Sequence, residues 1–364
     1  MNILQKYAHL LVHYCLEIKP GEKLYVTTTT LAEPLLREVY REAIRAGAYV
    51  EYHMSFRDQN SIFISEANDD QLDHIYPAYK EMMATFDAYL VIRAPFDVRE
   101  DQGNDPQKTA RRQKALFVVN QIYTERIADR SLKRCLCQYP TQTAAQEAGM
   151  SLEEYQDFVY NACHLSAEDP AATWRKVREM QQGITDYLNH SDQIRYINKR
   201  SDISFSVKGR TWINSDGKAN MPSGEVFTGP IEDSVNGHIY FNYPIVYMGH
   251  EVEGVTLHVK EGKVVQWEAE KGQHFLDEIF KIDGARYFGE VAIGTNYNIR
   301  QITKNILFDE KIGGSVHMAI GQSYKQTGGK NQSPIHWDMI TDMKDGGQIW
   351  VDGKLIYHNG HFLI

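Results

Sequence analysis

The chain has 364 residues, of which 42% are hydrophobic and 24% charged, and its formal net charge is −9. This acidic balance argues against nucleic acid or an anionic membrane surface as a partner. No segment approaches the roughly 20 apolar residues that cross a bilayer, and residues 1–6 lack the pattern of a signal peptide. Because the chain exceeds the usual size of one hydrophobic core, we expect two domains.

Cysteine use indicates a reducing compartment. The chain has four cysteines, Cys15, Cys135, Cys137 and Cys163, too few for a disulfide framework and without the paired spacing of a zinc site. Cys135 and Cys137 are two residues apart, so in a strand they would lie on one face. We expect two buried thiols there rather than a redox centre, and a cytoplasmic protein.

Residues 1–190 are expected to form an N-terminal α/β domain. Apolar residues recur at helical spacing, and the resulting helices are expected over residues 3–18, 31–46, 151–163 and 170–187. Ser151 and Glu154 have the spacing of a capping box at the start of one of them. Short apolar runs predict strands over residues 24–26, 48–52 and 88–92. Strands separated by helices predict a layered α/β fold with a mostly parallel sheet.

Residues 191–364 are expected to form a mostly antiparallel, β-rich domain that carries the metal site and the catalytic residues. Alternating segments broken by glycines predict strands over residues 203–207, 255–259 and 263–267, and a short helix follows over 273–280. The last segment, 347–364, predicts a closing hairpin with Asp352-Gly353 at its turn. No glycine-rich dinucleotide fingerprint follows the first strand, and no organic cofactor is expected.

Four segments of this second half combine glycine with residues that can bind metals. They cover residues 220–227, 289–294, 313–321 and 334–338. In a strand, residues two apart project from the same face, so His336 and Asp338 would converge. Glu290 and His317 would each be followed on their own faces by alanine and glycine only. We expect these small residues to leave open volume for a metal, water and substrate.

Each of these segments alone has a simpler explanation. A Glu or His at the end of a half-buried strand is usually a polar residue that faces solvent, and a glycine usually marks a turn. Two glutamates, two histidines and one aspartate that recur beside glycines are harder to explain in this way. The residues by themselves therefore support a hypothesis of a metal site, and do not establish one.

The same segments resemble the thermophilic aminopeptidase family, which includes aminopeptidase T, aminopeptidase S and the PepS-type enzymes. The motifs occur in family order: Asn-Met-Pro-x-Gly-Glu-Val-Phe-Thr from Asn220, Gly-Glu from Gly289, Asp-Glu-Lys-Ile-Gly-Gly-x-x-His from Asp309, and His-Trp-Asp from His336. The resemblance covers nearly the whole chain. It implies a metallo-aminopeptidase that releases the N-terminal residue of short peptides, and a cytoplasmic homodimer.

Carried over residue by residue, the resemblance implies a set of metal ligands: Glu225, Glu290, His317, Tyr324, His336 and Asp338. It implies catalytic roles for Glu225, Glu290 and Tyr324. We expect two divalent metal ions per subunit, with a water activated between them. Imidazole nitrogen together with carboxylate oxygen favours zinc, cobalt or manganese, and magnesium is possible.

Within this set we expect Glu225, Glu290 and His317 to hold one ion and His336 with Asp338 to complete the second. Either glutamate is expected to bridge the two ions. A further group of polar residues is expected to orient ligands or substrate, although most are equally explained as turn residues: Asp233, Asn236, His238, Asn296 and Asn331. Lys311 could contact a substrate carboxylate, although a surface lysine is the more common outcome.

Two other functions compete with this one. A glycosidase could use Glu225 and Glu290 as its pair of carboxylates, but it would leave His317, His336 and Asp338 without a role. A non-catalytic metal-binding homologue would keep the ligands without turnover. The complete ligand set argues against that alternative.

Overall fold

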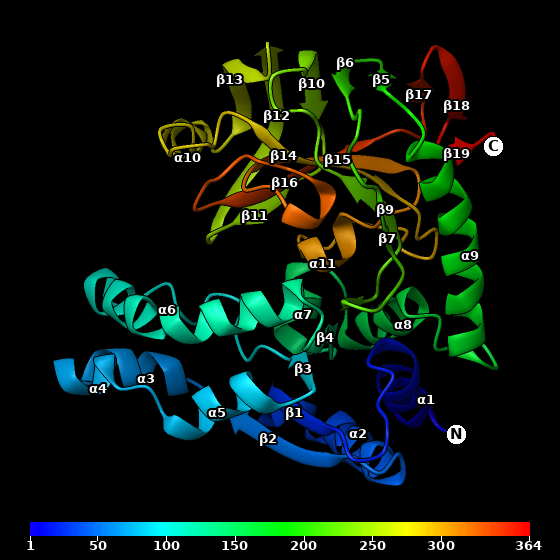
Figure 1. The fold of residues 1–364 in the computed structure, drawn as a ribbon. Helices are drawn as coiled ribbons and strands as arrows, with labels where there is room; N and C mark the ends of the chain where they lie inside the picture. Colours follow the sequence, from blue (N-terminus) through cyan, green and yellow to red (C-terminus); the bar gives the residue numbers. More distant parts are fainter. The chain divides into compact units, whose positions relative to one another are not determined.

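The computed structural model describes residues 1–364, which form two units (Figure 1). The first unit comprises Met1–Ala171 and Gly217–Pro222, and the second comprises Ala172–Asp216 and Ser223–Ile364. Nearly all of helix α9 (Pro170–Leu188) belongs to the second unit, because Ile184 and Leu188 pack into its hydrophobic core.

A five-stranded parallel sheet organises the first unit. Its order is β2-β1-β3-β4-β8, and every neighbouring pair in it is parallel. The strands are β1 (Lys23–Thr29), β2 (Tyr49–Ser55), β3 (Ala88–Arg93), β4 (Lys133–Gln138) and β8 (Asn220–Met221). The predicted layered α/β fold with a mostly parallel sheet is confirmed. Strand β8 is the exception to the sequence analysis, because it comes from a segment expected to belong to the β-rich half.

Helices surround this sheet within the first unit. They are α1 (Ile3–His9), the π-helix η1 (Leu10–Cys15), the 3-10 turn η2 (Thr30–Ala32), α2 (Glu33–Arg45), α3 (Gln59–Glu66), α4 (Asp69–Asp73), α5 (Pro77–Thr85), α6 (Pro106–Ala128), α7 (Gln142–Glu147) and α8 (Leu152–Ala162). Helix α2 contacts β1 and β2. Tyr25 packs with Met83 of α5 and Val119 of α6. The capping box of Ser151 and Glu154 forms as predicted at the start of α8.

All four cysteines lie in the first unit as buried thiols outside any disulfide: Cys15, Cys135, Cys137 and Cys163. Cys135 and Cys137 share one buried face of β4, as expected from their spacing. Burial raises the pKa of Cys15, Cys137 and Cys163 well above that of a free thiol, because the thiolate would lose its hydration. None of the helices combines the length and the apolar character needed to cross a membrane.

Two antiparallel sheets form the second unit, as the alternating sequence predicts. The larger has the order β11-β12-β10-β6-β5-β17-β18-β19, with β13 paired to β12. Its strands are β5 (Gln193–Asn198), β6 (Ser201–Ser206), β10 (Asn236–Phe241), β11 (Ile245–Tyr247), β12 (His250–Lys260), β13 (Lys263–Lys271), β17 (Gln348–Val351), β18 (Lys354–His358) and β19 (His361–Phe362). The predicted closing hairpin is β17–β18, with Asp352 and Gly353 at positive φ in its turn.

The smaller antiparallel sheet has the order β16-β15-β14-β9-β7. Its strands are β7 (Ile213–Ser215), β9 (Glu225–Thr228), β14 (Phe288–Gly294), β15 (Ser315–Gly321) and β16 (His336–Asp342). Three short helices complete the unit: α10 (Gln273–Ile279), α11 (Ile306–Asp309) and the 3-10 turn η3 (Lys325–Thr327). Val291, Met318 and Trp337 point from one face of the smaller sheet into the core of the unit, which leaves the opposite face for polar residues.

Glu251, at the start of β12, forms two ion pairs whose contribution to the stability of the fold can be measured. It pairs with Lys271 of β13 at 2.6 Å and with Lys304, and these contacts lower its pKa to about 2. The folded-state pKa lies below the unfolded value, so the pairs stabilise the fold above about pH 4.5 and lose this effect as the pH falls towards 2. Because the carboxylate is 27% exposed, we expect Glu251→Gln to lower the free energy of unfolding by about 1 kcal/mol at pH 7.

Urea unfolding of the wild type and Glu251→Gln at pH 7 and at pH 3 measures this difference, which should shrink at the lower pH. Glu253→Gln is the matched control, because Glu253 contacts Lys271 only and is 41% exposed. A constant difference between wild type and Glu251→Gln at both pH values would contradict the assignment.

Candidate metal centre

The smaller sheet brings the four motif segments together on one face. Cross-strand pairing places a small residue opposite an acid or an imidazole throughout this region: Gly294 opposite Glu225, Ala319 opposite both Glu290 and Asp338, Ala292 opposite His317, and Gly321 opposite His336. Because neighbours in register project from the same face, the five polar side chains emerge together. Glu225, Glu290 and His317 are buried.

These five side chains form one cluster. The imidazole Nε2 of His317 lies 3.3 Å from Glu290 Oε1, 3.5 Å from Glu225 Oε2 and 3.9 Å from Asp338 Oδ1. The imidazole Nε2 of His336 lies 3.3 Å from Glu290 Oε2 and 3.5 Å from Asp338 Oδ1. One oxygen of Glu290 therefore faces His317, and the other faces His336.

The glycines of these strands have a different role from the expected one. A Cβ on Gly294 would lie 2.2 Å from the carbonyl oxygen of Ile312, and a Cβ on Gly321 would lie 2.2 Å from that of Ile335. Both glycines thus permit a close approach of backbone segments, and the expectation that they leave open volume is wrong. Ala292 and Ala319 place only a methyl group opposite His317 and Asp338.

Buried hydrogen bonds hold the cluster in place. His336 Nδ1 lies 2.7 Å from the carbonyl oxygen of Gln322 and donates to it, which orients the ring with Nε2 toward Glu290. Gln181 of α9 is fully buried, and its amide nitrogen donates to the carbonyl oxygen of Glu225 at 3.2 Å. The Gln181 amide oxygen accepts from Thr295. Helix α9 therefore fixes the strand that carries Glu225.

Asn296 and Asn331, two of the residues expected to assist the ligands, hold nearby backbone. Asn296 is buried and donates from its side chain to the carbonyl oxygen of Ser223, two residues before Glu225. Asn331 donates to the carbonyl oxygen of Gly321 at the end of β15. The other three expected residues, Asp233, Asn236 and His238, lie in or just before β10 of the large sheet, apart from the smaller sheet that carries the cluster.

Lys311 is fully buried beside this cluster, and the expectation of a surface lysine is wrong. Its ammonium lies 3.2 Å from Glu225 Oε1 and pairs also with Glu310. Burial opposes its charge, but these carboxylates outweigh burial and raise its pKa. With two carboxylates of the protein on its ammonium, Lys311 pairs internally rather than with a substrate carboxylate. Glu310, which the sequence analysis did not select, approaches His317 and Asp338.

The pKa of each titratable group in the cluster is set by burial and by the charges of its neighbours. Burial opposes the charge of both imidazoles, yet the surrounding carboxylates raise the pKa of His317 to about 9 and raise that of His336 further. Burial also opposes the charge of Asp338, but the two imidazoles hold its pKa at about 2. Burial, with a contribution from Glu225 and Asp338, raises the pKa of Glu310 to about 8, although Lys311 opposes this shift.

The donor atoms fit a pair of divalent cations. Glu225 Oε2 and Asp338 Oδ1 are buried without a hydrogen-bond partner, although each lies within 3.5 Å of an imidazole. Glu225, Glu290 and His317 present donor atoms within 4.8 Å of one another, and so do Glu290, His336 and Asp338. Glu290 belongs to both groups. Carboxylate oxygen with imidazole nitrogen suits zinc and related dications.

Tyr324 lies at the accessible side of the cluster. Its ring centre is 5.0 Å from that of His336 and 5.7 Å from that of Phe227, and the residue is 43% exposed. Burial of the hydroxyl raises its pKa, and the neighbouring His336 opposes this effect. The structure thus brings the ring of Tyr324 next to one of the expected ligands.

Comparisons with known proteins identify metalloproteases and aminopeptidases as similar, which agrees with a cluster of metal-ligand side chains. Residues 1–362 match the family model described as thermophilic metalloprotease (M29). Aminopeptidase 2 of Geobacillus stearothermophilus is 30% identical over 352 residues, covering 88% of this chain and 84% of that protein. Aminopeptidase T of Thermus thermophilus is 25% identical over 390 residues, covering 96% of this chain and 95% of that protein. The structure titled wild-type AmpT from Thermus thermophilus superposes with a TM-score of 0.87 at 22% identity, covering 100% and 99% of the chains.

Because Lys311 is buried between carboxylates, we expect its replacement to lower the stability of the protein strongly. Lys311→Met keeps most of the buried volume but leaves Glu225 and Glu310 without their cation. Breaking a buried pair by removing one partner costs about 3–5 kcal/mol. We expect a loss of this order in the free energy of unfolding of the metal-free protein, measured by urea unfolding. Lys344→Met, at a lysine 46% exposed on the same unit, is the control, and equal effects of the two changes would refute the buried pair.

Proposed function

Since the chain belongs to the thermophilic metalloprotease family and is a metal-dependent aminopeptidase, we propose that it binds two divalent ions in the cluster of the smaller sheet. The observation that carries this proposal is the position of Glu290. Its two carboxylate oxygens face two different imidazoles at 3.3 Å each. A carboxylate in this arrangement suits a bridge between two cations.

In this proposal, Glu225, Glu290 and His317 hold one ion, and Glu290, His336 and Asp338 hold the other. The two groups of donor atoms share only Glu290, which favours Glu290 over Glu225 as the bridge. Lys311 occupies Glu225 Oε1 and leaves Oε2 for the ion. Zinc, cobalt or manganese suits these donors better than magnesium.

The two ions supply a polarised substrate carbonyl and a water of lowered pKa. The catalytic role of Glu225 and Glu290 would be to hold the ions that lower the pKa of this water, since both are buried carboxylates of the cluster that face His317. We assign Tyr324 a hydrogen bond to the substrate, because its ring lies beside His336 on the accessible side of the cluster. The hydrogen bond from Gln181 and the pair with Lys311 keep Glu225 in one orientation.

The substrates proposed are short peptides, from which the enzyme releases the N-terminal residue. The names of the relatives, aminopeptidases 2 and T among them, support this reaction class. We propose the second unit as the catalytic domain, since it carries all six candidate residues. The resemblance further supports a homodimer, and the four free thiols suit a cytoplasmic setting.

The glycosidase alternative fits the structure less well. Such an enzyme needs space for a sugar ring between its two carboxylates. Here Glu225 and Glu290 approach the same nitrogen of His317, at 3.5 and 3.3 Å, so an imidazole occupies the space between them. A non-catalytic homologue would bind metal and leave aminoacyl amides intact, so turnover separates it from the proposed enzyme.

Metal removal is the first test of this function. Dialysis against a chelator should abolish hydrolysis of aminoacyl p-nitroanilides, because in this proposal the ions lower the pKa of the attacking water. Zinc, cobalt or manganese, added singly, should restore the rate, and full recovery should need at least two equivalents per chain. Recovery complete at one equivalent, or a rate that chelation leaves unchanged, would rule out the two-ion proposal.

Glu290→Gln tests the bridging carboxylate. The amide keeps the shape of the side chain but loses its charge and one acceptor oxygen, and we expect kcat/KM to fall about 10²–10⁴-fold. Steady-state kinetics gives the loss of activity, and metal analysis of the same sample shows whether the variant still binds its ions. Glu268→Gln, at an exposed carboxylate of β13, should retain the wild-type rate. A Glu290→Gln enzyme that carries two ions and works at the wild-type rate would disprove the role.

A further inference from the structure

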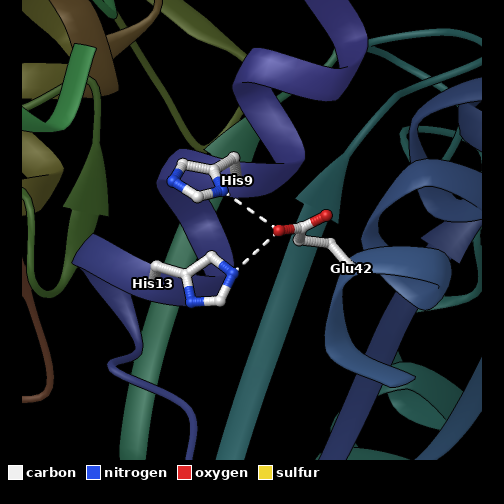
Figure 2. A group of neighbouring side chains, drawn as sticks. All are labelled: His9, His13 and Glu42. Carbon is white, nitrogen blue, oxygen red and sulfur yellow. Dashed lines mark hydrogen bonds and ion pairs between the residues drawn. The ribbon is translucent and has the colours of Figure 1, made fainter. Parts of the chain in front are cut away.

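A second group of side chains of the types that bind metals lies in the first unit and shares no residue with the cluster of the smaller sheet. Figure 2 shows His9, His13 and Glu42, whose polar atoms point toward one another. His9 Nδ1 lies 3.0 Å and His13 Nε2 lies 2.8 Å from the same oxygen, Glu42 Oε1. The three donor atoms lie within 4.8 Å of one another. Two imidazoles and one carboxylate therefore converge on one point.

The helices of the first unit create this arrangement. His9 ends α1, and His13 lies one turn later in the π-helix η1, so both imidazoles lie on the same side of the helix. Glu42 comes from the last part of α2, which contacts both α1 and η1. π-Helical turns are rare and occur frequently at functional sites. Here the turn carries one of the two histidines.

The spacing suits a tetrahedral ion. Bonds of about 2.0–2.1 Å to imidazole nitrogen and carboxylate oxygen place the donor atoms roughly 3.3 Å apart. The observed separations of 3.0 and 2.8 Å are a few tenths of an ångström shorter, so small side-chain rotations open the site. The histidine side chains are 45% and 37% exposed, which leaves water free to complete the coordination.

The remaining oxygen of Glu42 has a separate partner. Arg45 Nη1 lies 3.6 Å from Glu42 Oε2, and its side chain is 68% exposed. Oε1, which faces the two imidazoles, is therefore the oxygen available to an ion. Arg45 on the other oxygen orients the carboxylate, as hydrogen-bonded partners commonly do for metal ligands.

We propose that His9, His13 and Glu42 form an additional metal site of the first unit, which binds a dication that prefers imidazole, with Zn²⁺ as the best fit. The site ties α1 and η1 to α2, so its ion stabilises the packing of these helices. It is independent of the proposed two-ion centre, because no residue is shared and the ligands belong to the other unit.

The test counts zinc ions on the full-length chain. Metal-stripped wild type, His13→Asn and Glu42→Gln are dialysed against micromolar free Zn²⁺, and bound zinc is measured per chain. Each variant should bind one equivalent fewer than the wild type, since loss of a ligand should weaken the site by about 10–100-fold or more. Aminopeptidase activity should stay at the wild-type level, which reports separately on the two-ion centre.

His258→Asn is the matched control. His258 and His238 form another pair of neighbouring imidazoles on β12 and β10, with ring centres 5.8 Å apart. Arg195 occupies both carboxylate oxygens of the nearby Asp202, whereas Arg45 contacts only one oxygen of Glu42. This variant should keep the wild-type number of zinc ions. Loss of the same equivalent in His258→Asn would show unspecific binding to surface histidines and overturn the proposal.

Hydrogen exchange provides a second measurement that does not depend on stoichiometry. Zinc should slow amide exchange over residues 3–15 and 33–45 in the wild type, because the ion links α1 and η1 to α2. In Glu42→Gln, zinc should leave the exchange of these residues unchanged. Equal zinc content in wild type and both variants, or equal protection of these helices with zinc in wild type and Glu42→Gln, would overturn the site.

Discussion

The smaller sheet of the second unit holds an excess of negative charge inside the protein. Glu225, Glu290, Glu310 and Asp338 gather around His317, and Lys311 is the one permanent cation in contact with them. Buried carboxylates are costly unless they are paired or bind metals. Without ions, protonated imidazoles balance part of this negative charge, and the carboxylates accordingly raise the pKa of both His317 and His336. The two dications that we propose would neutralise the same charge and would leave the imidazoles free to act as ligands.

The smaller antiparallel sheet makes this concentration of charge possible. Its strands point Val291, Met318 and Trp337 into the hydrophobic core and point acids and imidazoles to the other face. The residues opposite the polar ones are small, so side chains from four strands meet without steric conflict. The charged groups are thus held by a sheet whose stability comes from its apolar face, and they need not stabilise the fold themselves.

Local patterns in the sequence predicted much of this architecture, and tertiary contacts account for what they missed. The spacing of His336 and Asp338 predicted their convergence, because strand geometry is local. The resemblance to a family supplied the set of candidate residues, and their grouping follows from strands distant in sequence. Lys311 could not be recognised as buried, since its environment depends on Glu225, 86 residues away. Gln181 was missed for the same reason: a glutamine in an amphipathic helix gives no sign that it donates to the carbonyl of Glu225.

The distribution of cysteines allows local unfolding of the first unit to be followed by thiol reactivity. All four thiols are buried in the first unit, and none lies in the second. Thiolates react and protected thiols do not, so a thiol-alkylating reagent added to the native protein modifies it only when the first unit opens. The rate of alkylation then measures the local opening free energy of the parallel-sheet unit alone. Hydrolytic activity in the same sample would report on the unit to which we assign the metal centre.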